Sequence, residues 1–160
     1  MEKVQFKSAI GADHTPQEVA SAVLEFMKVD LDRAYAITIG TDSELYGKTS
    51  ADFVTAIVVH RVGNGARYFW RRIKMQNFHT MRDRILQEVM TSLDTAKLIL
   101  AQLKKLDTPE YSFEIHVEVG ENGETKSMIQ ELVGMIRAND FEAKTKPESY
   151  AASSVADRHV

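Results

Sequence analysis

The sequence predicts an α/β fold in which a five-stranded mixed sheet is flanked by helices. Residues 35–75 hold three apolar segments joined by short polar turns, the pattern of antiparallel hairpins. Residues 79–157 alternate between helical and strand periodicity, which is typical of parallel strands joined by helical crossovers. The first apolar segment ends at Asp42, and a carboxylate at the end of a buried strand is costly unless it is paired or binds a metal.

The first 30 residues predict an N-terminal arm and one helix. A weak alternation around Phe6 fits either an extended arm or a short edge strand, and the sequence leaves both open. Thr15 fits the N-cap of a helix, because Pro16 suits the first helical position and Glu18 completes a capping box. The helix is expected to end before the polar stretch that begins at Asp30.

The first strand of the sheet is predicted over residues 35–42. Its side chains alternate between a face of larger residues and a face that holds Ala36, Thr38, Gly40 and Asp42. Because the second face is built from small residues, another part of the chain is expected to approach it closely. After Asp42, the segment up to residue 50 is polar and is expected to form a turn.

Two more antiparallel strands are predicted over residues 52–62 and 66–75. The first is apolar on both faces, so both of its faces should be covered. Gly63, Asn64 and Gly65 separate the two strands and suit a hairpin turn with positive φ. The many charged residues of the third strand favour a position at the edge of the sheet.

The second half of the chain predicts helices at residues 79–106, 124–138 and 149–157 and strands at 111–119 and 141–146. Right-handed crossovers would make these strands parallel and give the sheet order 3-2-1-4-5. Connections then leave the first and fourth strands in opposite directions, and ligands bind at the carboxyl ends of strands at such a switch point. Asp42 and Glu118 are both predicted at those ends.

Composition limits the class of protein. At 160 residues the chain is most simply one domain, with an arm and helix in residues 1–30 and a core in residues 34–157. It has no cysteine and no apolar run long enough to span a bilayer, so a cytoplasmic protein without membrane association is the default expectation. Its net charge of −3 argues against a protein that coats nucleic acid through bulk charge.

Acidic residues on four predicted elements form the candidate site. Glu88 lies on the core-facing stripe of the long helix, Glu118 at the end of the fourth strand and Asp157 on the terminal helix. Each has an ordinary alternative: Glu88 could reach solvent and pair with Arg84, Glu118 could belong to a solvated strand face, and Asp157 could be a surface residue. Such acids would repel one another if they converged without a cation.

The chemistry that this set suits is divalent-metal catalysis. Mg²⁺ and Mn²⁺ prefer carboxylate oxygens, and two such ions can clamp the attacking and leaving oxygens of a phosphoryl displacement. No glycine-rich phosphate loop, metal-binding histidine pair or serine nucleophile elbow is present. The proposed contacts to substrate phosphates, for which ordinary solvated polar or charged residues are the alternative, are Ser43, Arg71, Arg72, Lys74, Arg82 and Arg84.

Four segments resemble the YkuK-like family of bacterial proteins, a largely uncharacterised branch of the ribonuclease H-like superfamily. They are Ile39–Ser43, Ala56–Arg61, Gly63–Phe69 and Lys146–Arg158, and the resemblance extends over nearly the whole chain. It implies the ribonuclease H fold, in agreement with the predicted order of elements.

The resemblance also implies an acidic cluster. Asp42 matches the first-strand Asp of the superfamily, Glu88 the first-helix Glu and Asp157 the late-helix acid. Glu118 stands where the superfamily has an Asp, so its carboxylate is one methylene farther from the strand. The same four residues are the predicted catalytic and metal-binding residues for Mg²⁺ or Mn²⁺.

Three functions follow from the sequence. The leading hypothesis is a metal-dependent nuclease-like protein that acts on nucleic acid phosphodiesters. The first alternative is a non-catalytic module of the same fold that binds nucleic acid or a protein partner. The second alternative is a structural or regulatory protein in which Lys146 or Arg158 holds the acids in salt bridges.

Overall fold

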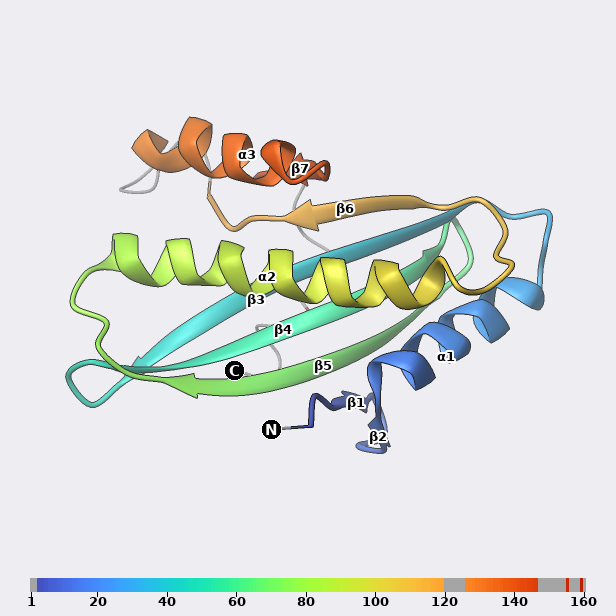
Figure 1. Ribbon diagram of the computed structural model, residues 1–160, viewed down its shortest axis with the longest axis horizontal. Coiled ribbons are helices and arrows are strands. Elements are labelled where there is room, and N and C mark those ends of the chain that lie inside the picture. Colours follow the sequence, from blue (N-terminus) through green and yellow to red (C-terminus); the bar gives the residue numbers. More distant parts are fainter. Residues whose placement is uncertain (1–2, 120–125, 147–154, 156–158, 160) are drawn as a thin grey trace.

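A seven-stranded mixed sheet runs through the described part of the chain (Figure 1). The computed structural model describes residues 3–119, 126–146, 155 and 159. The strands lie in the order β2-β1-β5-β4-β3-β6-β7. The elements are β1 (Phe6–Ser8), β2 (Asp13–His14), α1 (Pro16–Lys28), β3 (Tyr35–Tyr46), β4 (Ser50–Arg61), β5 (Ala66–Met75), α2 (Met81–Leu103), β6 (Ser112–His116), a 3₁₀ turn (Lys126–Met128), α3 (Ile129–Ala138) and β7 (Glu142–Lys144).

The prediction of a five-stranded sheet is wrong, because β1 and β2 extend the sheet at one edge. The five expected strands keep their relative order, β5-β4-β3-β6-β7, inside the larger sheet. β1 pairs with β5, with Lys7 opposite Trp70, so β5 is not an edge strand along its whole length. Strands of two and three residues are too short to produce a readable alternation, which is why the sequence left this segment open.

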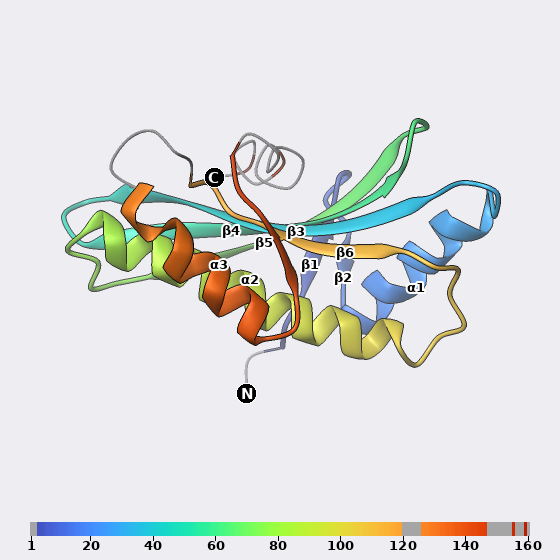
Figure 2. The ribbon, with the colours of Figure 1, turned by 90° about the horizontal axis from the view of Figure 1, so that it is seen from above.

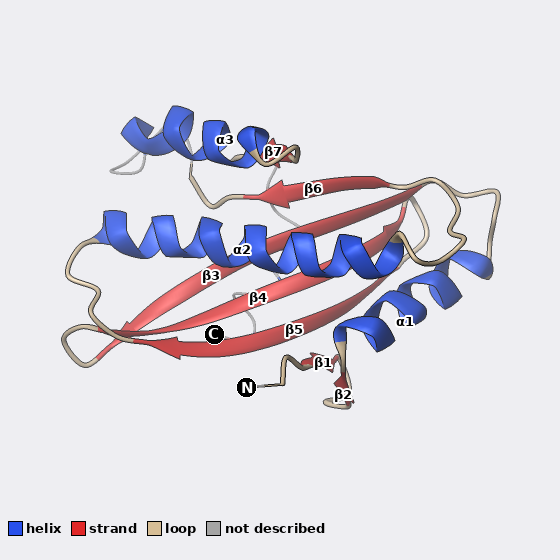
Figure 3. Cartoon of the chain, in the orientation of Figure 1, coloured by secondary structure: helices blue, strands red, loops and turns tan. Residues whose placement is uncertain are grey.

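The central hairpins are longer than predicted. β3 continues past Asp42 to Tyr46 and stays paired with β4 up to Ser50, where a turn was expected. The turn between them contains Gly47 at φ +65°, and the next hairpin closes through Gly63 and Gly65, also at positive φ. Figure 3 shows the resulting contrast between the long β3, β4 and β5 and the short strands at both edges.

Helix boundaries follow local capping signals. Thr15 and Glu18 form the predicted capping box at the start of α1. Thr80 caps α2 by accepting a hydrogen bond from the backbone N–H of Asp83, so this helix begins at Met81. The predicted helix at 124–138 is confirmed over Ile129–Ala138, whereas the predicted terminal helix at 149–157 lies almost entirely outside the described residues.

The helices α1, α2 and α3 lie on one face of the sheet (Figure 2). The main core fills this layer, where Ile37 and Ile39 of β3 pack with Val89 and Leu93 of α2. None of the described helices is long and apolar enough to cross a membrane.

The opposite face of the sheet carries a smaller apolar cluster. Val54, Ala56 and Val58 of β4 pack there with Val155, and the rings of Tyr68 and Trp70 flank them. The neighbouring residue across from Ala56 is the buried Gly40. The small face of β3 therefore lies next to this cluster.

Candidate active site

The site lies where β6 ends beside β3, and Asp42 lies four residues before β3 itself ends at Tyr46. In their pairing Gly40 is opposite His116, and Asp42 and Glu118 each lie two residues farther along. Because the two strands run parallel, this register brings the two acids to one place. The backbone N–H of Ser43 donates a hydrogen bond of 2.9 Å to Oδ1 of Asp42.

Helix α2 brings the third acid, Glu88, to the same edge. The Glu88 side chain is 9% exposed, and its Oε2 accepts a hydrogen bond of 2.5 Å from the Ser43 hydroxyl. The alternative in which Glu88 reaches solvent is therefore wrong. Arg84, one turn earlier, donates instead to the backbone carbonyl of Ser43 at 3.4 Å.

A second contact fixes the position of α2 along β3. One turn after Glu88, the hydroxyl of Ser92 lies 2.7 Å from that of Thr41, which also lies 2.9 Å from the hydroxyl of Thr55. Two residues of a strand advance about 6.7 Å and four residues of a helix about 6.0 Å, so the two contacts match in spacing. The helix therefore runs antiparallel to β3, with Glu88 held beside Ser43 of that strand.

The electrostatics of Glu88 reflect burial among other acids. Its pKa is raised from 4.5 to about 8, mainly by loss of hydration and further by the charges of Asp42 and Glu118. The hydrogen bond from Ser43 and the charge of Arg84 oppose it. The charges of Asp42 and Glu118 are thus close enough to act on Glu88.

Glu118 has a basic partner. Its Oε2 lies 3.0 Å from Nζ of Lys146, in a pair whose side chains are 29% and 56% exposed. The backbone N–H of Lys146 also donates to the carbonyl of Val119, so this lysine is fixed beside the end of β6. One of the two basic residues that the sequence offered as salt-bridge partners therefore takes that role.

The carboxylate oxygens of these acids are the kind of ligand that a hard divalent cation prefers. Carboxylates on separate elements, one of them deprived of water, are the ligands that Mg²⁺ and Mn²⁺ prefer. Within the described ranges, however, no three acidic or histidine side chains are close enough together to hold an ion. The fourth predicted ligand, Asp157, lies outside the described residues, and so does Arg158.

The predicted phosphate-binding residues divide by their contacts. Arg82 donates to both carboxylate oxygens of Glu131 at 2.7 Å, and Lys74 lies over the ring of Tyr46. Arg72 donates to the backbone carbonyl of His159. Arg71 contributes to a basic pocket beside β1 that is described below.

The sequence analysis missed Asp52, and a second polar group, His116, also lies near these acids. Asp52 follows the start of β4 opposite Glu44, on the face of Asp42, and its Oδ1 is buried without a hydrogen bond. His116 is 7% exposed, and its Nδ1 also has no hydrogen-bond partner. Burial lowers the pKa of His116 to about 4. Asp52 could have been found from its hairpin register, whereas the burial of His116 depends on neighbouring strands.

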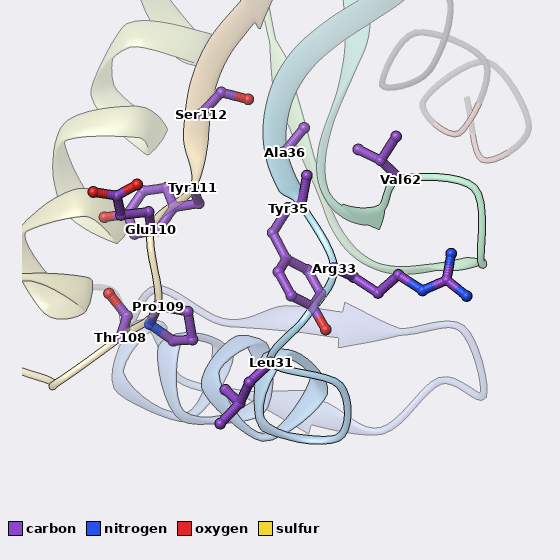
Figure 4. A pocket seen from close by; sticks show the side chains of 11 residues that line it. Leu31, Arg33, Tyr35, Ala36, Val62, Thr108, Pro109, Glu110, Tyr111 and Ser112 are labelled. Carbon is purple, nitrogen blue, oxygen red and sulfur yellow. The ribbon is translucent and has the colours of Figure 1, made fainter.

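The broadest cavity described is at the other end of the sheet. It measures about 1040 Å³ and lies where β3 and β6 begin, with Tyr35, Val62 and Pro109 in its wall (Figure 4). Ligands of open α/β sheets bind at the carboxyl ends of the strands, and this cavity is at the amino ends. It is therefore separate from the acidic site.

Comparison with known proteins identifies the family. The model of the family described as ribonuclease H-like matches residues 18–160. An uncharacterized protein of Bacillus subtilis (strain 168), YkuK, is 35% identical over 161 residues, which cover 92% of this chain and 91% of that protein. No solved structure matches the chain. With its α/β fold and mixed sheet, the chain belongs to the ribonuclease H-like family, in its YkuK-like group.

Proposed function

We propose that this protein is a divalent-metal-dependent nuclease-like enzyme that acts on nucleic acid phosphodiesters. The observation that carries the proposal is Glu88, a buried carboxylate whose pKa is raised to about 8 by burial and by the charges of Asp42 and Glu118. A bound cation would remove this unfavourable interaction and keep all three groups ionised. Membership of a ribonuclease H-like family supports the same direction of inference, although fold alone does not determine function.

The residues of the site divide into ligands and positioning groups. Asp42, Glu88, Glu118 and Asp157 would hold Mg²⁺ or Mn²⁺, which would polarise the phosphate and activate a water molecule. Ser43 would orient Glu88 through its hydroxyl and Asp42 through its backbone N–H. Arg84, which donates to the backbone carbonyl of Ser43, would offer its remaining guanidinium donors to the substrate phosphate.

Cleavage of labelled DNA and RNA oligonucleotides with Mn²⁺ tests the proposal. We expect cleavage by the wild type, its loss in EDTA and its loss in Asp42→Asn. The matched control is Asp94→Asn, which changes an exposed Asp on the solvent side of α2 and should leave cleavage unchanged. Cleavage that persists in Asp42→Asn would assign the activity to a contaminant or to another site.

The second candidate function is a non-catalytic module of the same fold that binds nucleic acid or a protein. The ion pair between Glu118 and Lys146 favours it, because an ammonium group already neutralises one acid of the site. This candidate predicts that the wild type binds oligonucleotides without cleaving them, whatever divalent cation is added. The same cleavage assay, with binding measured in parallel, therefore separates the two functions.

A further inference from the structure

A second charged feature lies beside the acidic site. A pocket of about 460 Å³ opens between β1 and β5, with Lys3, Lys7, Arg71 and Arg72 in its wall and Asp13 as its one acidic residue. The wall therefore carries a formal charge of +3 in a chain whose net charge is −3. Such a concentration of positive charge attracts polyanions even when the whole protein is acidic.

The sheet aligns this pocket with the acidic site. β3 and β5 are both antiparallel to β4, so their last residues lie at the same end of the sheet. Arg72 is opposite Val54, and Val54 is opposite Asp42, which places these three residues in one row on one face. Two strand spacings separate Arg72 from Asp42 by about 10 Å.

The basic side chains of this pocket keep hydrogen-bond donors that a ligand can use. Arg72 is steadied by the carbonyl of His159, whose ring stacks on Trp70 at 4.2 Å, and this bond uses only part of the five donors of the guanidinium. Lys7 pairs with Asp13 at 3.1 Å, with both side chains about half exposed. Exposed ion pairs of this kind are weak, so a phosphate can compete for the lysine.

We infer that this pocket binds a phosphate group of the nucleic acid strand that crosses the acidic site. The inference rests on the proposed function, and it names the path of the substrate: from Asp42 past Arg72 to Lys7 and Lys3. The N-terminal strand β1 and its neighbour β5 therefore form the wall of this path.

The test measures how salt affects binding of a fluorescent 12-nucleotide single-stranded DNA in EDTA, where no cleavage takes place. For single strands the slope of log K against log salt is about −0.7 for each phosphate contact. The variant Lys3→Gln/Lys7→Gln should therefore flatten the slope by about 1.4 and weaken binding at least about tenfold at 0.1 M salt. The matched control is Lys104→Gln/Lys105→Gln, which removes the same charge from exposed residues at the far end of α2 and should keep the wild-type slope.

A second variant acts in the opposite direction. Asp13→Asn removes the acid that pairs with Lys7 and should tighten binding, which keeps the inference testable if the double variant does not fold. Three results would each overturn the inference. The first is an unchanged slope in the double variant together with no gain in affinity in Asp13→Asn. The others are equal losses of affinity in the double variant and its control, and no DNA binding by the wild type.

Cleavage by the same proteins in Mn²⁺ is scored separately from binding. A slope change with no cleavage would support the pocket and count against the enzyme. Cleavage that is equal in the wild type and in the double variant, with no change in the salt slope, would support the enzyme and count against the pocket.

Discussion

The hydroxyl of Ser43 donates a hydrogen bond of 2.5 Å to the buried carboxylate of Glu88, and this bond joins β3 to α2. The same residue donates its backbone N–H to Asp42, the next-door acid on the opposite face of the strand. Ser43 therefore connects two acids that come from different elements. A substitution of Ser43 therefore changes the geometry of the site while all of its carboxylates remain.

Ser43→Ala removes the hydroxyl and leaves the Glu88 oxygen buried without this donor. We expect a loss of about 1–3 kcal/mol in the free energy of unfolding, because a buried charged acceptor loses its partner. The loss should be larger at pH 8 than at pH 5, since the hydrogen bond favours the ionised form of Glu88. Urea unfolding at both pH values measures it, with the exposed Ser21→Ala on α1 as the control. Equal losses at the two pH values would contradict this account of Ser43.

Glu88 should make the metal-free protein less stable as the pH rises. The pKa of Glu88 is about 8 in the folded state, whereas the ordinary value, which applies to the unfolded chain, is 4.5. The folded state therefore binds the proton more tightly. The contribution of this proton is complete below about pH 4.5 and is lost as the pH rises through 8. Each unit of pKa difference corresponds to about 1.4 kcal/mol.

Glu88→Gln should remove this dependence on pH. At pH 8 in EDTA we expect the variant to exceed the wild type by at least about 1.4 kcal/mol in free energy of unfolding. At pH 4.5 the two proteins should be nearly equal, because a protonated Glu and a Gln are close in size and both uncharged. Parallel pH profiles for the two proteins would rule out Glu88 as the source of the effect.

His116 should give the opposite trend on the acid side. Burial lowers its pKa to about 4 from 6.5, so the folded state favours the neutral ring. Its contribution to stability is complete above about pH 6.5 and is lost as the pH falls through 4. His116→Asn should therefore flatten the decline in thermal midpoint between pH 6.5 and 4, whereas the exposed His79→Asn should keep the wild-type profile.

Lys146→Gln tests whether the lysine competes with a metal ion for Glu118. Removal of a partly exposed ion pair should change stability by less than about 1 kcal/mol, and it should tighten Mn²⁺ binding several-fold because Glu118 is released. Lys144→Gln is the matched control, since Lys144 also pairs with a glutamate of the β6 segment, Glu114, at 4.0 Å. Weaker Mn²⁺ binding in Lys146→Gln alone would mean that the lysine supports the ion.

Much of the fold could be predicted because its signals are local. Gly63 and Gly65 mark a hairpin, and Thr15 and Glu18 mark a helix start. Glu88 stood on the core-facing stripe of α2 because its spacing from Ile85 is set by the helix period alone. The order of the five central strands followed from these elements and from the handedness of crossovers.

What the sequence did not predict depends on contacts between distant segments. The pairing of Lys7 with Trp70 creates the basic pocket, and neither residue carries a local signal for it. The contact between Lys146 and Glu118 was one of two offered salt bridges, and the choice depends on how the chain turns after β7. Likewise, burial of His116 results from its place beside Gly40 in the sheet.

The central claim is that the acids around Asp42 bind a divalent cation. Calorimetric titration of Mn²⁺ into the wild type and Asp42→Asn at pH 7, in two buffers of different ionisation enthalpy, tests it most directly. We predict binding by the wild type with release of about one proton, since Glu88 must ionise, and no binding by Asp42→Asn. Absence of binding to the wild type, or equal binding by both proteins, would contradict the claim.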